Sequence, residues 1–189
     1  YLGYSSPKTP SRVYRFNLSN KSKELVKEQE IPSGHNPANY IVERVEFKSH
    51  DGRLVPLTIT RHKKTKTDGS ANLLLYGYGS YGNSMSPSFS STRLSLIDRD
   101  IIWATAHIRG GMEKGMKWWK EGKLLNKRNT FEDYISVANF LIKKKYTTKR
   151  KIIGMGGSAG GLLMGAVVNQ EPDLFLGIIM AVPFVDSLT

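Results

Sequence analysis

The pattern of apolar and polar residues changes near residue 70 of the chain. Before this point, short runs alternate between apolar and polar positions, which is typical of strands with one face in solvent. The alternating runs cover residues 12–18, 24–27, 40–47 and 54–61. The last two flank Ser49-His50-Asp51-Gly52, whose Asp-Gly pair predicts a hairpin turn.

After residue 70 the apolar runs are continuous, at residues 71–76, 101–106 and 177–182. Continuous apolar strands are typical of a parallel sheet that is covered on both faces. A shorter strand-like run covers residues 151–155. We therefore expect a mainly parallel sheet in this part of the chain.

Helical patterns lie between these strands. Apolar residues recur at helical spacing from 131 to 142, and Thr130-Phe131-Glu132-Asp133 resembles a capping box, which predicts a helix that begins at Thr130. A second, buried helix covers residues 162–168 and is expected to end near Glu171-Pro172. The alternation of strands and helices predicts an α/β fold with right-handed crossover connections.

Composition narrows the class of protein. The 189 residues are 39% hydrophobic, enough for one domain with a substantial core. No cysteine is present, which rules out disulfides and thiolate chemistry and suits the cytoplasm, where we expect the protein to reside. No apolar run approaches the roughly 20 residues of a membrane helix, so no membrane partner is expected. The chain starts at Tyr1 without an initiator Met, as expected of a piece of a longer protein.

The net charge is +12, and the basic residues are dispersed, with short runs at 61–64, 143–145 and 149–151. A nucleic-acid site would interleave such runs with aromatic residues on one face or carry a known motif. Neither is visible, so we interpret the runs as solvated surface and expect no nucleic-acid partner. No metal site and no cofactor are expected.

The segment Gly156-Gly157-Ser158-Ala159-Gly160 carries the strongest chemical signal. It fits the G-x-S-x-G pattern of a nucleophile elbow, and it lies between a predicted strand and a predicted helix as that pattern requires. Small residues on both sides allow a sharp turn that exposes Ser158 at its tip. The alternative is a phosphate-binding turn, but neither a P-loop pattern nor a dinucleotide-binding pattern is present.

A serine nucleophile needs a base, and the sequence supplies no histidine after Ser158. In the hydrolase order the acid and the histidine both follow the serine, yet only Glu171, Asp173 and Asp186 are carboxylates beyond it. All four histidines lie upstream; His107, at the end of a predicted strand, is the alternative base, although a loop-anchoring role suits it better. We therefore expect the chain to end before its own base.

An acyl-transfer site also needs two donors for the oxyanion. The backbone N–H of Ala159, directly after the nucleophile, is the first candidate. The loop Tyr76-Gly77-Tyr78-Gly79-Ser80-Tyr81-Gly82 follows a predicted strand and offers the second, because its glycines allow a close approach and a tyrosine hydroxyl can donate. Alone, this loop would be interpreted as an aromatic turn without chemistry.

Four blocks of the chain together resemble the prolyl oligopeptidase family of serine peptidases, and within it the oligopeptidase B (protease II) branch. The blocks are Leu75–Gly82, Arg93–Arg99, His107–Gly115 and Gly156–Gly165. The resemblance implies an α/β-hydrolase fold, incomplete on its C-terminal side, preceded by β segments that resemble the end of a β-propeller. It places terminal propeller-like strands and a linker in residues 1–35. The N-terminal part of the catalytic domain would then cover residues 36–189.

The resemblance also implies roles for individual residues. Ser158 would be the acylated nucleophile, with Tyr78 and the Ala159 N–H as the oxyanion donors. Tyr81 and Phe184 would line the pocket for the residue before the scissile bond. Substrates would be short peptides cleaved after Arg or Lys, while the family's catalytic Asp and His have no counterpart among these residues.

Two departures from the family pattern affect these expectations. Oligopeptidase B usually carries two acidic residues shortly after the tyrosine loop, whereas residues 84–89 contain none, which puts selection for a second basic residue in doubt. The family usually has a third glycine where this chain has Met112. A methionine there would fill space and could alter the loop.

Two alternative hypotheses remain. The chain by itself could be a non-catalytic, truncated remnant, whose exposed sheet edge would promote self-association. It could also belong to another α/β-hydrolase such as an esterase, for which the elbow alone would suffice.

Overall fold

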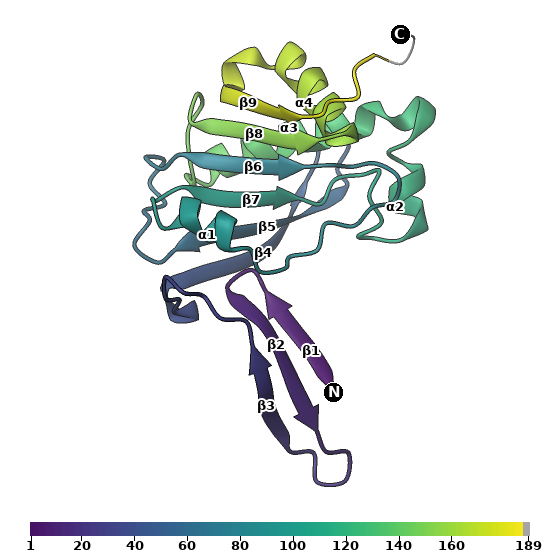
Figure 1. Cartoon of the computed structure of the whole chain (residues 1–189). Helices are drawn as coiled ribbons and strands as arrows, with labels where there is room; N and C mark the ends of the chain where they lie inside the picture. Colours follow the sequence, from purple (N-terminus) through teal and green to yellow (C-terminus); the bar gives the residue numbers. More distant parts are fainter. Residues whose placement is uncertain (187–189) are drawn as a thin grey trace.

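The computed structural model describes residues 1–186 as two β sheets and the helices that cover the larger one (Figure 1). The smaller sheet is antiparallel and contains β1 (Leu2–Ser6), β2 (Thr9–Phe16) and β3 (Lys23–Glu28) in that order. It projects from one end of the larger sheet (Figure 1). The alternating runs predicted in the first 30 residues thus form strands of a sheet of their own.

The larger sheet has six strands in the order β4-β5-β7-β6-β8-β9. Their bounds are β4 Tyr40–Lys48, β5 Leu54–His62, β6 Leu73–Gly77, β7 Ile102–Ala106, β8 Ile152–Gly157 and β9 Phe175–Ala181. Strands β7, β6, β8 and β9 are parallel neighbours, as their continuous apolar runs predict. β4 and β5 form the predicted antiparallel hairpin, in which the Gly52 N–H donates to the Ser49 carbonyl at 3.0 Å.

Helices cover both faces of the six-stranded sheet (Figure 1). The helices are α1 Ser91–Ile97, α2 Met116–Lys120, α3 Arg128–Lys143 and α4 Ala159–Gln170, with single 3₁₀ turns η1 Pro37–Asn39, η2 Leu124–Asn126 and η3 Pro172–Leu174. α3 and α4 pack with the main core on one face, where Leu75 and Ala104 point. α1 packs on the other face against Trp103.

The start of α3 differs from the prediction. The helix begins at Arg128, and Thr130 is no cap: its buried hydroxyl donates to the carbonyls of Arg109 (2.8 Å) and Gly122 (3.2 Å). The capping-box interpretation of 130–133 was therefore wrong, because long-range contacts use these polar side chains. The predicted end of α4 is confirmed at Gln170, just before Glu171-Pro172.

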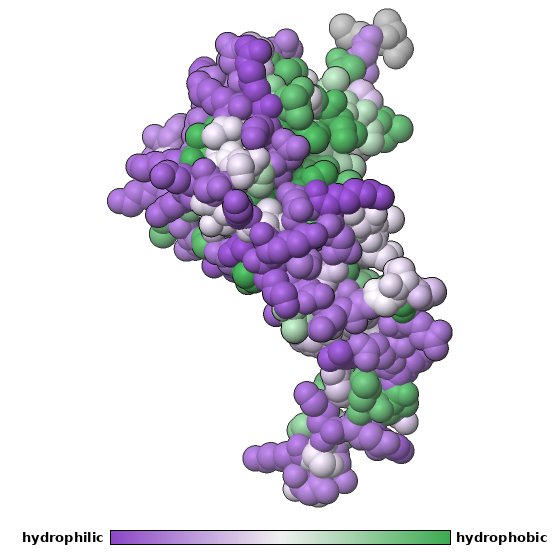
Figure 2. All heavy atoms as spheres, turned by 90° about the vertical axis from the view of Figure 1, so that its left-hand side faces the viewer, coloured by the Kyte–Doolittle hydropathy of each residue, from purple (hydrophilic) through white to green (hydrophobic). Residues whose placement is uncertain are grey.

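The last described strand, β9, forms one edge of the six-stranded sheet and is poorly covered. Leu176, Ile179 and Met180 are all at least 45% exposed. Figure 2 shows hydrophobic side chains gathered in the upper part of the molecule, where Figure 1 places β9. Among residues 1–186, no helix has both the length and the apolar character to cross a membrane.

The link between the two sheets runs from the end of β3 at Glu28 to the start of β4 at Tyr40 and contains only the short turn η1. A boundary between residues 35 and 36 falls inside this link. The boundary remains a prediction.

Candidate active site

Ser158 lies where β8 ends and α4 begins, and its backbone makes a sharp turn. Its φ of 55° and ψ of −118° lie in a left-handed region that residues with a side chain rarely adopt. Such a conformation costs about 1–3 kcal/mol, so the surrounding structure must hold it. Two backbone hydrogen bonds stabilise it: the Ser158 N–H donates to Ala181 O at 2.8 Å, and the Ser158 carbonyl accepts from the Gly161 N–H at 2.8 Å. The side chain is exposed at the tip of the turn.

The first turn of α4 lies close against the end of β6. A Cβ on Gly160 would lie 2.8 Å from the Gly77 carbonyl oxygen, so only glycine allows this approach. Ala159 is the first residue of the helix, and the N–H of a first helical residue has no partner within the helix. A backbone donor and the positive end of the helix dipole therefore lie beside Ser158.

Tyr78 follows the carboxyl end of β6, at the same edge of the sheet as Ser158 at the end of β8. Its ring lies next to the first turn of α4, because Cδ2 is 3.4 Å from the position that a Cβ on Gly160 would take. The side chain is half-buried. The fold thus places the tyrosine loop and the elbow side by side.

Tyr81 and Phe184 line one cavity of about 400 Å³, although both side chains are more than half exposed. Ala159 lines the same cavity, whereas Ser158 and Tyr78 are not among its lining residues. The structure therefore brings together three of the five predicted site residues in one cavity; of the other two, Ser158 directly precedes Ala159, and Tyr78 is three residues before Tyr81. Its other lining residues are Ser80, Trp119, Gly122, Lys123, Leu124, Lys127 and Leu162. No Asp or Glu of residues 1–186 lines it, but two lysines do.

His107 is a buried anchor of the sheet. Its side chain is 1% exposed, with Nε2 at 2.8 Å from Thr58 Oγ1 and 3.2 Å from Arg44 Nη1. On its other side, Nδ1 lies 3.5 Å from Glu113 Oε1. These contacts favour the loop-anchoring interpretation over a role as the base for Ser158.

Glu113 connects this histidine to the segment after the tyrosine loop. Its Oε1 accepts from the Met85 N–H at 2.9 Å. Burial by itself would raise the pKa of Glu113, but the close approach of His107 and the hydrogen bond from the Met85 N–H outweigh it and lower the pKa. Glu113 is therefore an anionic acceptor that fixes the loop.

A buried ion pair behind the tyrosine loop was not predicted from the sequence. Arg109 donates from Nε and Nη2 to the Asp133 carboxylate at 2.8 and 2.6 Å, and from Nη1 to Asp51 at 2.5 Å. Desolvation alone would lower the pKa of Arg109, but the hydrogen bonds with Asp133 and Asp51 raise it. The ion pair holds the loop after β7, against which Gly79 packs. The only signal in the sequence was the helix-interior position of Asp133, which the capping-box interpretation misread.

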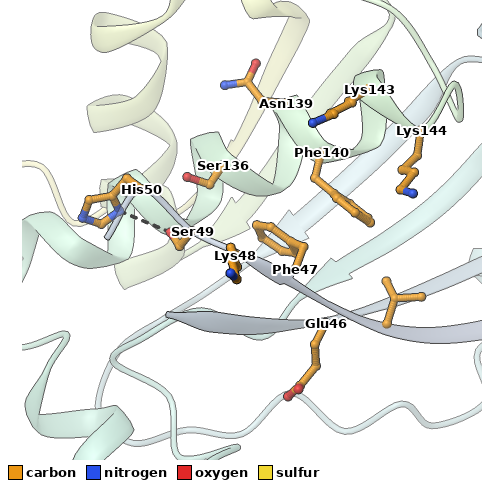
Figure 3. Close-up of a pocket in the computed structure, with 11 residues that line it drawn as sticks. Glu46, Phe47, Lys48, Ser49, His50, Ser136, Asn139, Phe140, Lys143 and Lys144 are labelled. Atoms are coloured by element: carbon orange, nitrogen blue, oxygen red, sulfur yellow. Dashed lines mark hydrogen bonds between the residues drawn. The ribbon is translucent and has the colours of Figure 1, made fainter. Parts of the chain in front are cut away.

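A larger cavity lies elsewhere, between the end of β4 and α3, and measures about 750 Å³ (Figure 3). It contains a serine and a histidine in contact, with Ser49 Oγ 3.2 Å from His50 Nδ1. The Ser49 hydroxyl donates its one proton to Asp133 at 2.6 Å, so it can only accept from His50. The pair is therefore no nucleophile and base, and this cavity is not a second catalytic centre of that kind.

Comparison with known proteins agrees with this geometry. The model of the prolyl oligopeptidase family matches residues 87–189, which include the elbow. The chain belongs to the prolyl oligopeptidase family, whose members are serine peptidases.

Among curated relatives, the chain is 46% identical over 187 residues to a dipeptidyl aminopeptidase BI of Pseudoxanthomonas mexicana. It is 40% identical over 188 residues to protease 2 of Moraxella lacunata. These matches cover 98% and 100% of this chain but only 26% and 27% of the relatives. The chain thus spans about a quarter of the length of the relatives that it matches.

Solved structures support the fold. Oligopeptidase B from Leishmania major matches with a TM-score of 0.90 at 46% identity, over 97% of this chain and 26% of that one. A structure from a study of two prolyl endopeptidases matches with a TM-score of 0.91 at 38% identity, over 97% and 27%. The predicted α/β-hydrolase part with a propeller-like start is therefore confirmed as the fold class.

Proposed function

We propose that this chain carries the nucleophile and the oxyanion donors of a serine oligopeptidase that hydrolyses short peptides through an acyl-enzyme. The observation that carries the proposal is the strained turn at Ser158, which costs stability although the side chain of Ser158 itself is exposed. Strain of this kind at an exposed serine serves to present the hydroxyl. The adjoining Ala159 N–H and Tyr78 supply donors where the oxyanion would form.

The base would come from outside these 189 residues, because no histidine follows Ser158 and His107 is occupied by Thr58 and Glu113. We therefore propose that residues 1–189 alone do not turn over peptides. An enzyme that lacks triad members keeps only the acceleration given by binding and the oxyanion donors.

The first experiment labels the complete polypeptide that contains this chain with an active-site fluorophosphonate. Labelling is expected on Ser158 and is expected to vanish in Ser158→Ala. Equal labelling of both proteins would refute the assignment of the nucleophile. Residues 1–189 on their own serve as the comparison for the second proposal: peptide hydrolysis well above background, abolished by Ser158→Ala, would contradict it.

The proposed preference for Arg or Lys before the scissile bond rests on the likeness to proteins named oligopeptidase B and protease 2. The cavity lined by Tyr81 and Phe184 would take that residue, yet Lys123 and Lys127 line it as well. Selection for a basic side chain would thus need carboxylates from other parts of the protein. Comparing kcat/KM for Arg, Pro and Ala fluorogenic peptides, each with a blocked and a free N-terminus, tests this preference and separates endopeptidase from dipeptidyl aminopeptidase action.

A further inference from the structure

Lys127 lies where η2 meets α3 and turns its side chain inward. Its Nζ donates to the Gly79 carbonyl at 2.6 Å and contacts Ser80 Oγ at 2.7 Å. The ring of Phe131 lies 6.0 Å from the ammonium. Lysine side chains normally keep their ammonium in water, so a lysine that turns its ammonium inward to bind a loop is unusual.

The loop that Lys127 binds has an unfavourable backbone. Gly79, Tyr81 and Gly82 all have positive φ, at 65°, 56° and 67°. Tyr81 has a side chain and therefore adopts this conformation under strain. Among residues 1–186, the only side-chain hydrogen bonds that residues 78–82 receive come from Lys127.

The rest of the protein also packs against this loop. The Gly82 N–H donates to Gly110 O at 2.9 Å. A Cβ on Gly79 would collide with Thr130 Cγ2 of α3 and would lie 2.8 Å from Cγ1 of Ile108, so both α3 and the segment after β7 pack closely against Gly79. Lys127 adds side-chain hydrogen bonds to this packing, next to the cavity that Tyr81 and Ala159 line.

We propose that Lys127 is a positioning residue, whose ammonium holds the Gly79 carbonyl and the Ser80 hydroxyl so that Tyr78 and Tyr81 keep their places beside the nucleophile. The proposal rests on the proposed peptidase function. An oxyanion donor acts mainly in the transition state, so a misplaced Tyr78 lowers kcat more than it raises KM. Displacements of about 1 Å can cost about 10²-fold in rate.

Burial disfavours the charged form and lowers the pKa of Lys127 to about 8, so at neutral pH the side chain is still mainly the ammonium that donates to the loop. The other charged residue in the cavity lining, Lys123, lies 3.5 Å over the Trp119 ring, and none of the hydrogen bonds among residues 1–186 joins its side chain to the loop. No carboxylate of residues 1–186 pairs with Lys127. Its interactions are therefore those with the loop.

The test uses the complete polypeptide with Lys127→Met, and Lys120→Met as the matched control. Lys120 is an exposed lysine on the nearby α2, so its change to Met removes a charge without touching the loop. Lys127→Met is expected to lower kcat about 10²-fold with KM changed less than threefold. Lys120→Met is expected to keep both values. An unchanged kcat in Lys127→Met, or a loss confined to KM, would overturn the proposal.

A rescue separates positioning from general damage to the fold. Lys127→Cys is alkylated with 2-bromoethylamine, which restores an ammonium of nearly the same length, and mass spectrometry verifies the modification. At least a tenfold recovery of kcat is expected relative to the same variant before alkylation. No recovery at full modification would contradict the role of the ammonium.

Hydrogen exchange tests the inference without an activity measurement. In Lys127→Met, the backbone amides of residues 78–83 are expected to exchange at least fivefold faster than in the wild-type protein, and the exchange of α1 is expected to stay unchanged. If the wild-type protein shows no labelling of Ser158, the proposed function fails. Faster exchange of the loop in Lys127→Met would still show that Lys127 fixes the loop. Unchanged exchange of the loop overturns the proposal in either case.

Discussion

Ser158 has a backbone conformation that a residue with a Cβ adopts only under strain, with φ 55° and ψ −118°. Glycine adopts it freely, although glycine also gains more entropy in the unfolded chain. We therefore expect Ser158→Gly to raise the free energy of unfolding by about 1 kcal/mol, the strain relieved less the entropy lost. Urea denaturation measures the change.

The matched control for that strain is Ser158→Ala, which keeps the Cβ and removes only the hydroxyl. Since Ser158 is exposed, this change is expected to alter the free energy of unfolding by less than about 0.5 kcal/mol. Equal stabilities of the Gly and Ala variants would mean that the strain is no larger than the entropy that glycine costs.

The ionisation of Lys127 gives stability a pH dependence. Its pKa is about 8 in the folded chain, because of burial, and about 10.4 for an unperturbed lysine in the unfolded chain. Between these values the unfolded chain binds more protons, so the contribution of Lys127 to stability rises with pH from about 8 to about 10.4. The unfolding free energy of the wild type minus that of Lys127→Met is expected to increase over this window. A constant difference from pH 7 to 10 would show that the pKa is not lowered.

At the scale of elements, α3 is fixed to the loop after β7 by a carboxylate that is completely buried. Asp133 is 0% exposed and binds Arg109 through two oxygens, whereas Asp51, which binds the same guanidinium, is 34% exposed. Removing one partner of a buried pair leaves an uncompensated charge and costs about 3–5 kcal/mol, whereas partly exposed pairs contribute about 1 kcal/mol or less.

Two single substitutions compare these carboxylates. Asp133→Ala is expected to lower the free energy of unfolding by about 3–5 kcal/mol, and Asp51→Ala by about 1 kcal/mol. Denaturant titrations of both variants give the two values. Similar losses would mean that burial does not determine how strongly each carboxylate holds Arg109. Should Asp133→Ala not fold, Asp133→Asn provides the milder comparison.

The strands of the six-stranded sheet and the helices α3 and α4 were predictable because their apolar patterns are local, whereas α1 and α2 were not predicted. The runs at 71–76, 101–106 and 177–182 became β6, β7 and β9 within two residues, and the Asp-Gly turn lies where its pair of residues predicts. The capping box failed since the hydroxyl of Thr130 serves contacts that are distant in the chain. Apolar periodicity predicts which face of an element is buried, but it does not predict which polar side chains form hydrogen bonds with residues that are distant in the sequence.

At the candidate site, too, only local patterns could be predicted from the sequence. The elbow was predictable because its strand, turn and helix are contiguous. The contact of Lys127 with the tyrosine loop was not predictable, since Lys127 and Gly79 are 48 residues apart and only the fold brings them together. Whether the five predicted site residues act as proposed is a question for the labelling and kinetic experiments.

At the scale of the whole molecule, the uncovered strand β9 bears on how residues 1–189 behave alone. Edge strands with apolar side chains offer unpaired backbone groups and a hydrophobic surface to another copy. Leu176, Ile179 and Met180 supply that surface beside the unpaired edge. The net charge of +12 opposes association, and salt screens that repulsion.

We therefore expect the 189-residue chain to self-associate, more strongly at 0.5 M than at 0.05 M salt. Ile179→Lys places a charge in the β9 surface and is expected to shift sedimentation towards the monomer at equal protein concentration. Leu125→Lys is the matched control, because Leu125 is fully exposed on η2 and is not part of the β9 surface, and the substitution adds the same charge. If both variants shift sedimentation equally, total charge rather than β9 governs association. A wild-type chain that stays monomeric at both salt concentrations would contradict the prediction altogether.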